Sequence, residues 1–250
     1  MKNIVAAVQV RMGSSRLPGK VMAEIEGRPM TWHIVNRLRQ AKLLQNVVIA
    51  VPDNELNEPV RRMAEDESIP YFAGSEADVI GRLYKTACAF DADVLVRICG
   101  DCPLVDPDIV DKVVQKYIDG CCQHIGNTRP PTFPDGLDVG LFSFQLLRRL
   151  NDILETEIDR EWYMLYIWEN MDTIRIDNVT REEDISHLRW TVDYPEDLEF
   201  VQEVYAELGG DFRTADVLAL LERRPELVIL DEPRYRRGQM NVYLEGELTH

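Results

Sequence analysis

Residues 4–20 read Ile4-Val5-Ala6-Ala7-Val8-Gln9-Val10-Arg11-Met12-Gly13-Ser14-Ser15-Arg16-Leu17-Pro18-Gly19-Lys20. The apolar start is typical of a buried strand, and the turn that follows it holds three basic residues and no acidic one. Glycines and serines let backbone amides and hydroxyls point at an anion where a strand ends, as phosphate-binding loops do. We therefore expect residues 11–20 to bind a negatively charged ligand, with a solvent-exposed basic turn as the alternative.

The chain as a whole is acidic. Among its 250 residues, 44 Asp and Glu oppose 28 Lys and Arg, which gives a formal net charge of −16. This charge disfavours a nucleic acid partner, whereas a small anionic ligand needs only a local basic patch. No apolar run approaches the roughly 18 residues of a membrane span, and no signal-peptide core precedes the first strand. We expect a cytoplasmic protein that does not contact a membrane.

The five cysteines are odd in number and occur without an export signal, which favours reduced thiols over a disulfide framework. Cys99 and Cys102 spell C-x-x-C, so a redox motif is one alternative. A zinc site completed by Cys121, Cys122 and His124 is another. The motif ends a strand instead of opening a helix and has no second copy, which argues against both.

Strand-like runs alternate with helical patterns through the first half of the chain. Residues 46–51 and 93–98 are almost continuously apolar and rich in β-branched side chains, as in strands covered on both faces. Helical spacing of apolar residues predicts helices over 29–43, 56–67, 76–90 and onward from Pro107, with Asp106 as its N-cap. This alternation predicts an α/β fold with a mostly parallel sheet, helices on both faces, and a ligand beyond the carboxyl ends of the strands.

Two aspartates each end an expected strand. Asp101 follows the run 93–98, so we expect its carboxylate to face the same crevice as residues 11–20. Asp193 ends a short strand expected over 188–193. Mg²⁺ binds one or two protein carboxylates and fills its remaining positions with water and phosphate oxygens. Asp101 and Asp193 are therefore candidate metal ligands, and a turn-forming role is the alternative for Asp101.

The pattern changes after residue 120. Residues 128–144 are rich in proline and glycine and predict a loop with an extended segment outside the main sheet. Residues 158–171 predict one amphipathic helix whose aromatic side chains belong to the core or to a subunit contact. The remaining expectations are helices over 195–208 and 214–224, a strand-like tail at 227–230 and a solvated basic tail at 234–237.

Four motifs, in this order, resemble those of the cytidylyltransferases. They are residues 9–20 as quoted above, Arg97-Ile98-Cys99-Gly100-Asp101-Cys102-Pro103-Leu104, Phe133-Pro134-Asp135-Gly136-Leu137-Asp138-Val139, and Thr191-Val192-Asp193-Tyr194-Pro195-Glu196-Asp197-Leu198. The chain most resembles the SpsF-like proteins of spore-coat polysaccharide biosynthesis. The 3-deoxy-manno-octulosonate and acylneuraminate cytidylyltransferases are more distant.

The resemblance covers nearly the whole chain and implies a Rossmann-like nucleotidyltransferase fold of the glycosyltransferase-A type. It implies a single nucleotidyltransferase domain over residues 1–250. A small extended arm inserted at about 121–145 would serve acceptor binding and dimerisation, so a homodimer is expected.

The resemblance also implies CTP as the nucleotide substrate and Mg²⁺ as the cofactor. It assigns nucleotide binding to Arg11, Met12, Gly13, Ser14, Ser15, Arg16, Lys20, Asp78, Arg82 and Arg97. It assigns acceptor binding to Asn127, Asp135, Gly136, Asp138 and Arg160. The metal ligands would be Asp101 and Asp193, and the catalytic residues Lys20, Arg16 and Asp101.

The implied reaction activates an acidic sugar of the 3-deoxy-nonulosonate or octulosonate type to its CMP-sugar, with release of pyrophosphate, for surface polysaccharide or glycan synthesis. One alternative is a phosphate or phosphonate acceptor. Others are a glycosyltransferase of similar fold that consumes a nucleotide sugar, and a nucleotide-binding regulatory subunit. A glycosyltransferase would normally carry Asp-x-Asp where this chain has Gly100-Asp101-Cys102.

One segment departs from the family pattern. The relatives usually read Arg-Glu-His-Val-Thr where this chain has Arg160-Glu161-Trp162-Tyr163-Met164. We expect the acceptor pocket or the dimer contact to differ there.

Overall fold

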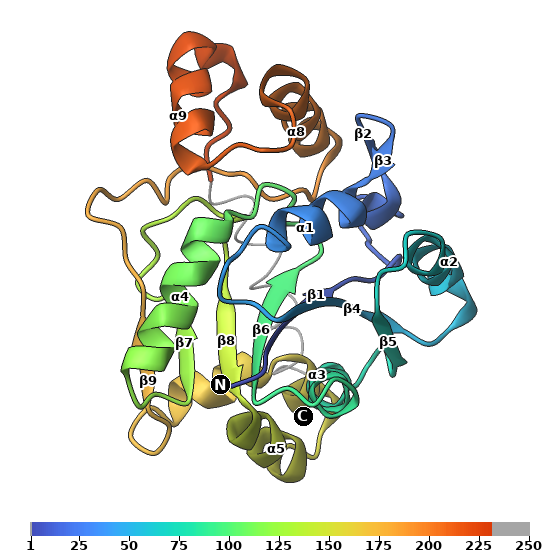
Figure 1. The fold of residues 1–250 in the computed structure, drawn as a ribbon, viewed down its shortest axis with the longest axis vertical. Coiled ribbons are helices and arrows are strands. Elements are labelled where there is room, and N and C mark those ends of the chain that lie inside the picture. The colour runs from blue at the N-terminus through green and yellow to red at the C-terminus, as the bar shows by residue number, and fades with distance from the viewer. Residues whose placement is uncertain (1, 232–250) are drawn as a thin grey trace, which may run out of the picture.

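A seven-stranded mixed sheet lies at the centre of the computed structural model, which describes residues 2–231 (Figure 1). The strand order is β5-β4-β1-β6-β8-β7-β9. The bounds are β1 Ile4–Gln9, β4 Asn46–Pro52, β5 Tyr71–Gly74, β6 Val94–Cys99, β7 His124–Gly126, β8 Gly140–Ser143 and β9 Ile176–Asn178. Strand β8 runs antiparallel to β6 and β7, and the other described pairs of this sheet are parallel. The expected mostly parallel sheet is confirmed.

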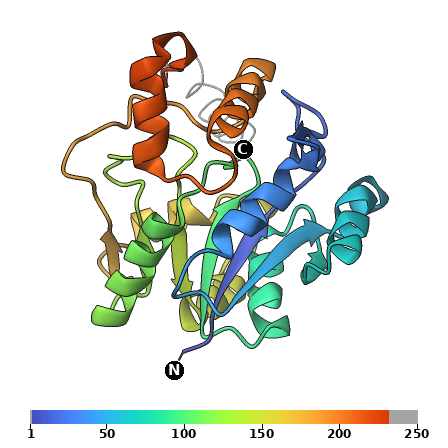
Figure 2. The same ribbon diagram turned by 45° about the horizontal axis from the view of Figure 1, so that its top comes forward.

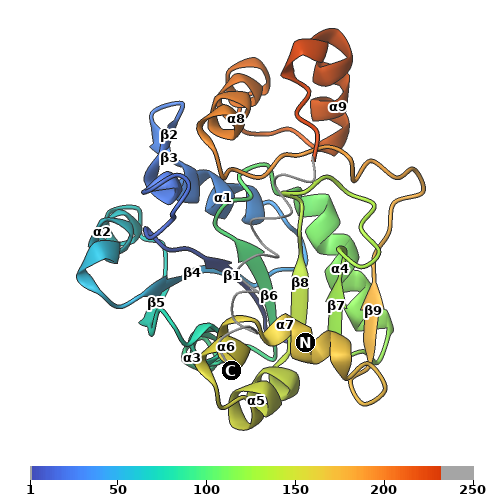
Figure 3. The same cartoon turned by 180° about the vertical axis from the view of Figure 1, so that it is seen from behind.

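Helices cover both faces of this sheet, because successive strand side chains point to opposite sides. Val94, Val96 and Ile98 of β6 face one apolar cluster, and Leu95 faces the other. The first cluster contains side chains of α1 Met30–Leu38, α2 Glu58–Asp66, α4 Pro107–Asp119, α8 Pro195–Leu208 and α9 Thr214–Arg223. The second contains side chains of α3 Val79–Ala89, α5 Phe144–Ile153 and α7 Tyr163–Glu169. Figure 3 shows this second face, with α6 Glu157–Glu161 leading into α7.

Short elements complete the fold. A two-stranded hairpin, β2 Glu24–Ile25 and β3 Arg28–Pro29, turns through Glu26 and Gly27, both at positive φ. Three 3-10 turns cover Lys20–Met22, Glu55–Asn57 and Pro225–Leu227. Helices α8 and α9 lie side by side (Figure 2). No helix of residues 2–231 is long and apolar enough to span a bilayer.

The expectation that an extended segment within 128–144 lies outside the main sheet is wrong. Strand β8 pairs with both β6 and β7, and its Leu141 and Phe142 are buried in opposite apolar clusters. A short apolar run between glycine- and proline-rich stretches can thus join a sheet as an antiparallel strand. The loop 127–139 connects β7 to β8, and the domain assignment with an arm at 121–145 stays a prediction.

Three other local expectations also need correction. Residues 158–171 form two helices instead of one, since Trp162 ends α6 and precedes α7 with φ −101 and ψ 29. Residues 188–193 form isolated bridges, Arg189 with Asp135 and Leu188 with Leu230, instead of a strand. The tail at 227–230 contributes only the last of these bridges. The basic cluster 234–237 lies outside the described residues.

Candidate active site

The loop between β1 and the first 3-10 turn is held in a fixed shape. The carbonyl oxygen of Met12 accepts hydrogen bonds from the amides of Ser14, at 2.9 Å, and Gly19, at 3.1 Å. The amide of Met12 donates to Oδ1 of Asn57 at 2.8 Å. Gly19 has φ +74, a conformation that L side chains rarely adopt. The loop therefore presents its basic side chains from a constrained backbone at the carboxyl end of β1.

Lys20 brings the two predicted metal aspartates together. Its buried Nζ lies 3.1 Å from Oδ2 of Asp101 and 2.7 Å from Oδ1 of Asp193, and it donates to the carbonyl of Val192 at 2.7 Å. Burial acts to lower the pKa of Lys20, but the two carboxylates outweigh it and raise that pKa above its ordinary value. Arg16 adds a second cation, with Nη2 2.6 Å from Oδ1 of Asp193.

Arg189 pairs with the second carboxylate oxygen of Asp193. The guanidinium, with only 2% of its surface exposed, places Nη2 3.0 Å from Oδ2 of Asp193 and also pairs with Asp197 and Asp135. Burial acts to raise the pKa of Asp193, and the charge of Lys20 leads the interactions that lower it below its ordinary value. Arg189 was not among the site residues predicted from the sequence. The available signal was a single cation within the otherwise apolar or neutral segment 188–192.

The segments that carry Asp101 and Asp193 are joined through their backbones. The amide of Val192 donates to the carbonyl of Asp101 at 2.9 Å, and the hydroxyl of Thr191 donates to the same carbonyl at 3.1 Å. Gly136 lets a neighbouring loop approach this segment, because a Cβ there would lie 2.5 Å from the backbone of Trp190 and Thr191. Asp101 and Asp193 thus come together through these contacts, and not because they end two adjacent strands.

The arrangement of Asp101 and Asp193 fits a divalent cation held partly by a ligand. Both carboxylates converge on one ammonium group, which shows that a cation sits favourably between them. Within residues 2–231, no group of three or more His, Cys, Asp and Glu side chains is placed to hold a metal alone. Two carboxylates match Mg²⁺, which commonly relies on substrate phosphates and water for its other ligands.

A cavity of about 820 Å³ opens in front of these residues. Ten predicted site residues line it: Arg11, Ser14, Ser15, Arg16, Lys20, Arg82, Arg97, Asp101, Asp138 and Asp193. Its volume lies within the usual range for small-molecule sites. Burial and the nearby charge of Asp101 raise the pKa of Asp138 to about 6, although Arg97 opposes the shift.

The other predicted site residues do not line this cavity, and their contacts are structural. They are Met12, Gly13, Asp78, Asn127, Asp135, Gly136 and Arg160. Asp78 caps α3 through the amide of Gly81 and forms a two-pronged ion pair with Arg160, at 2.7 and 3.0 Å. Asn127 spans its own loop, donating to the carbonyl of Leu137 and accepting from the amide of Val139, each at 2.8 Å.

One wall of the cavity includes the segment 161–164, where the departure from the family pattern predicts a different acceptor pocket or dimer contact. This wall comes from the end of α6 and from α7: Glu161, Trp162, Tyr163, Met164, Leu165 and Trp168. Gln9, Val10, Val21, Val79, Cys99 and Gly100 complete the lining. We expected the aromatic residues of 158–171 in the core or at a subunit contact. The usable signal was the departure from the family pattern at 160–164.

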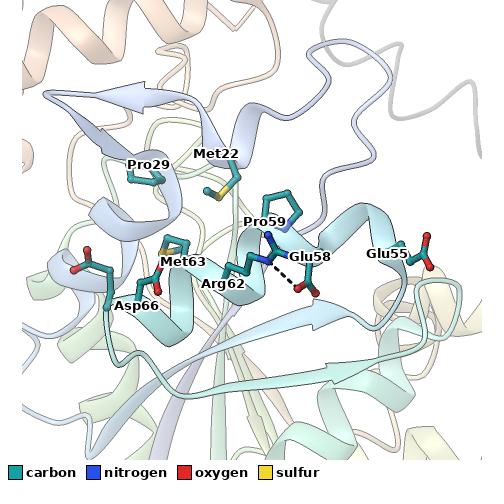
Figure 4. Close-up of a pocket in the computed structure, with 9 residues that line it drawn as sticks. Met22, Pro29, Glu55, Glu58, Pro59, Arg62, Met63 and Asp66 are labelled. Atoms are coloured by element: carbon teal, nitrogen blue, oxygen red, sulfur yellow. Dashed lines mark hydrogen bonds and ion pairs between the residues drawn. The ribbon is translucent and has the colours of Figure 1, made fainter.

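A second cavity, of about 630 Å³, lies between α2 and the β2–β3 hairpin (Figure 4). Its lining includes Glu55, Glu58, Asp66 and Glu67, with Arg62 paired to Glu58 at 3.0 Å. None of the predicted site residues lines it. Its acidic rim opposes binding of an anionic ligand, so the cavity beside Lys20 is the candidate active site.

The chain is similar in sequence and in fold to known cytidylyltransferases and to a spore coat protein. The cytidylyltransferase family matches residues 5–124. Spore coat polysaccharide biosynthesis protein SpsF of Bacillus subtilis is 30% identical over 235 residues, 90% of this chain and 97% of that protein. A solved cytidylyltransferase of Leptospira borgpetersenii has a TM-score of 0.86 at 28% identity, with 91% of this chain and 97% of that one covered. The 3-deoxy-manno-octulosonate cytidylyltransferase of Geobacter metallireducens is 34% identical over 118 residues, 46% of this chain and 44% of that enzyme.

Proposed function

Because the chain belongs to the cytidylyltransferase family and is a nucleotidyltransferase, we propose that it transfers CMP from CTP to an acidic sugar of the 3-deoxy-nonulosonate or octulosonate type. An acceptor oxygen bonds to the α-phosphorus, the bond between the α-phosphorus and the bridging oxygen breaks, and pyrophosphate leaves. The proposal extends to surface polysaccharide or glycan synthesis, which the name of the Bacillus subtilis relative supports.

The observation that carries the proposal is the convergence of Arg16 and Lys20 on Asp193 at the mouth of the loop 11–20. In the transfer of a phosphoryl-type group, a protein mainly positions the reacting groups and stabilises the charge of the transition state. In the proposed complex the two cations turn from the carboxylates to the triphosphate and stabilise the departing pyrophosphate. Ser14 and Ser15 line the same cavity and supply hydroxyl donors to the phosphates.

Asp101 and Asp193 are the proposed ligands of Mg²⁺. When bound, the metal neutralises phosphate charge and lowers the pKa of a coordinated hydroxyl. Asp138 supplies a further carboxylate at the cavity wall and is the proposed acceptor of the proton that the acceptor hydroxyl gives up. Arg189 orients Asp193 through its 3.0 Å contact and so acts as a positioning residue.

The acceptor is proposed to lie between the loop that follows β1 and the wall formed by residues 161–168. Four further residues are proposed to affect acceptor binding indirectly, because they hold the shape of the loops and helices beside the cavity: Asn127, Asp135, Gly136 and Arg160. A homodimer and a cytoplasmic location also belong to the proposal.

Pyrophosphate release tests the proposed function. The purified protein is incubated with Mg²⁺, CTP and a panel of acceptors that includes 3-deoxy-manno-octulosonate and N-acetylneuraminate. We expect release that depends on both CTP and one acidic sugar, and much less release with ATP, GTP or UTP. Lys20→Met should release pyrophosphate about 10²–10³-fold more slowly. Release from no CTP–acceptor pair, together with cleavage of a nucleotide sugar, would overturn the proposal in favour of a glycosyltransferase.

A further inference from the structure

Two cysteine thiols flank Asp101, one of the proposed metal ligands. Cys99 ends β6 and lines the cavity, and Cys102 is buried, with 3% of its surface exposed. Residues 99–102 form a tight turn, because the amide of Cys102 donates to the carbonyl of Cys99 at 3.3 Å. In such a turn the first and fourth Cα atoms lie within about 7 Å of each other, and disulfides join Cα atoms about 4.4–6.8 Å apart. The backbone of this turn therefore suits a disulfide between Cys99 and Cys102.

The side chains of the two cysteines are also neighbours. A hydrogen bond between the thiols is the first cause that raises the pKa of Cys102 above its ordinary value, ahead of burial. Sγ of Cys102 also donates to Oδ1 of Asp101 at 3.5 Å. Both cysteines are free thiols in the structure. They are thus placed to join without a large movement of the backbone.

Cys99 is the thiol that an oxidant can reach. It is half-buried on the wall of the cavity, whereas Cys102 packs within the apolar cluster on one face of the sheet. Exposure and access decide which thiol of a pair is oxidised first. An oxidant that enters the cavity therefore meets Cys99, and Cys102 lies beside the product. Disulfides of this transient kind occur in compartments that otherwise keep thiols reduced.

A disulfide at this place changes the surroundings of Asp101. A disulfide sulfur carries no hydrogen, so Oδ1 of Asp101 loses the donor that Cys102 supplies. The ring that the bond closes contains Gly100 and Asp101, and it restricts the backbone that carries the carboxylate. The carbonyl of Asp101 accepts from Thr191 and Val192, so a shift of the turn also acts on the segment that leads to Asp193. A misplacement of about 1 Å in a catalytic site can lower its rate about 10²-fold.

We propose that Cys99 and Cys102 are a site of reversible oxidation, and that the disulfide between them blocks the candidate active site by displacing Asp101. The disulfide stands on the geometry of the turn alone, and its effect on turnover rests on the proposed function. The C-x-x-C sequence then serves neither as a zinc site nor as a catalytic redox motif. It makes the transfer of CMP depend on the redox state of the protein's surroundings.

A hydroperoxide is the proposed oxidant. The sulfur of Cys99 attacks one oxygen of hydrogen peroxide, the O–O bond breaks, and a sulfenic acid and one water form. The sulfur of Cys102 then attacks the sulfur of Cys99, the S–O bond breaks, and a second water leaves. The two thiols together lose two electrons and two protons, and the peroxide is reduced to water. A dithiol reverses the reaction by thiol–disulfide exchange and is itself oxidised to a disulfide.

The mass of one tryptic peptide tests the disulfide independently of activity. Trypsin cuts after Arg97 and Lys112, so the peptide 98–112 contains Cys99, Cys102 and no other cysteine. The whole protein is treated with hydrogen peroxide, its free thiols are blocked with N-ethylmaleimide, and it is digested. We expect the peptide to be unblocked and two hydrogens lighter after peroxide, and doubly blocked after a further treatment with dithiothreitol. A peptide that stays doubly blocked after peroxide, or gains oxygen without forming the bond, overturns the proposal.

Pyrophosphate release tests the consequence of the disulfide. After peroxide we expect the rate of the wild type to fall about 10–10²-fold and to return with dithiothreitol. Cys99→Ser and Cys102→Ala should each keep the rate that the same variant has before peroxide. Cys121→Ser removes an exposed thiol outside the cavity and is the matched control, which should respond as the wild type does. Inactivation of Cys99→Ser to the same extent as the wild type, or full activity of the disulfide form, overturns the switch.

Thermal unfolding separates failure of the switch from failure of the proposed function. Mg²⁺ and CTP together should raise the unfolding temperature of the reduced protein more than that of the disulfide form. Equal shifts in the two forms show that the disulfide leaves the site intact, so the switch is refuted and the function stands. If the reduced protein neither responds to Mg²⁺ and CTP nor releases pyrophosphate with any acceptor, the proposed function fails. The mass of the peptide 98–112 then still decides whether the disulfide forms.

Discussion

Lys20 and Asp193 are 173 positions apart in the chain, and Nζ of the lysine lies 2.7 Å from Oδ1 of the aspartate. Asp101 contacts the same Nζ at 3.1 Å. In the structure the lysine occupies the place that we propose for a cation shared with the substrate. Binding of Mg²⁺ and CTP must therefore separate Lys20 from the carboxylates, and the ammonium group becomes available to the phosphates in the same movement.

The Lys20→Met variant tests whether the ammonium group of Lys20 occupies the place proposed for the metal ion. Without the ammonium group, Asp101 and Asp193 repel each other and gain from any cation placed between them. Mg²⁺ without nucleotide should therefore raise the unfolding temperature of Lys20→Met more than that of the wild type, while turnover falls about 10²–10³-fold. Thermal unfolding with and without Mg²⁺ measures the first effect and pyrophosphate release the second. Equal Mg²⁺ shifts in the two proteins would count against a metal between these aspartates.

Arg189 should matter for both stability and activity, although it does not line the cavity. Its guanidinium is buried among Asp135, Asp193 and Asp197, and Arg189→Met leaves these acids without their shared cation. Loss of one partner from a buried ion pair costs about 3–5 kcal/mol. Arg189→Lys keeps the charge and should lose less. Urea denaturation measures the free energy of unfolding of both variants, and similar stability of Arg189→Met and wild type would show that the cluster is not coupled to folding.

The raised pKa of Asp138 predicts that turnover depends on pH. Burial and the charge of Asp101 raise its pKa to about 6, so the carboxyl is protonated below that pH and ionised above it. Only the ionised form can accept a proton from the acceptor hydroxyl. At saturating CTP, acceptor and Mg²⁺ we expect kcat to rise with pH and to level off above about pH 6. A nearby metal charge would lower the pKa of Asp138 and move this inflection to a lower pH. Asp138→Asn should flatten this profile and lower its plateau. An unchanged inflection in the variant assigns the ionisation to another group.

The sequence predicted that the turn 11–20 and Asp101 lie at one cavity, because contiguous residues carry the signal. The turn 11–20 combines glycine, serine and cations directly after an apolar strand, and Asp101 directly follows another strand. The deep wall of the cavity was not predictable in this way. Tyr163 belongs to an apolar helical pattern, and that pattern is equally satisfied by a core position. Only the fold places Tyr163 at the cavity.

The same limit applies to pairs of charges distant in sequence. Arg189 and Asp135 are 54 positions apart and meet because Gly136 allows the two backbones to touch. Asp78 and Arg160 resembled family site residues, yet the structure joins them to each other. A polar residue that a motif marks as functional can thus serve by shaping the loop or helix next to the site.

Arg160 provides the clearest test of that distinction. Its guanidinium donates to both carboxylate oxygens of Asp78 and to the carbonyls of Asn151 and Leu154. Arg160→Met should remove these bonds and lower the free energy of unfolding by about 2 kcal/mol, since charged hydrogen bonds contribute 1.5–3 kcal/mol each and the pair is partly exposed. The KM for the acceptor should change less than about threefold at temperatures where the variant is folded.

Arg148→Met is the matched control for Arg160→Met. Arg148 lies on the neighbouring helix α5, and its ion pair with Asp152, at 3.8 Å, is largely exposed to solvent. An exposed pair of this kind contributes at most about 1 kcal/mol, so the control should unfold almost as the wild type does. If Arg160→Met instead keeps the stability of the control and raises the acceptor KM tenfold or more, the arginine contacts the acceptor directly. The ion pair with Asp78 would then be a resting arrangement that the substrate opens, as we propose for Lys20 and its two aspartates.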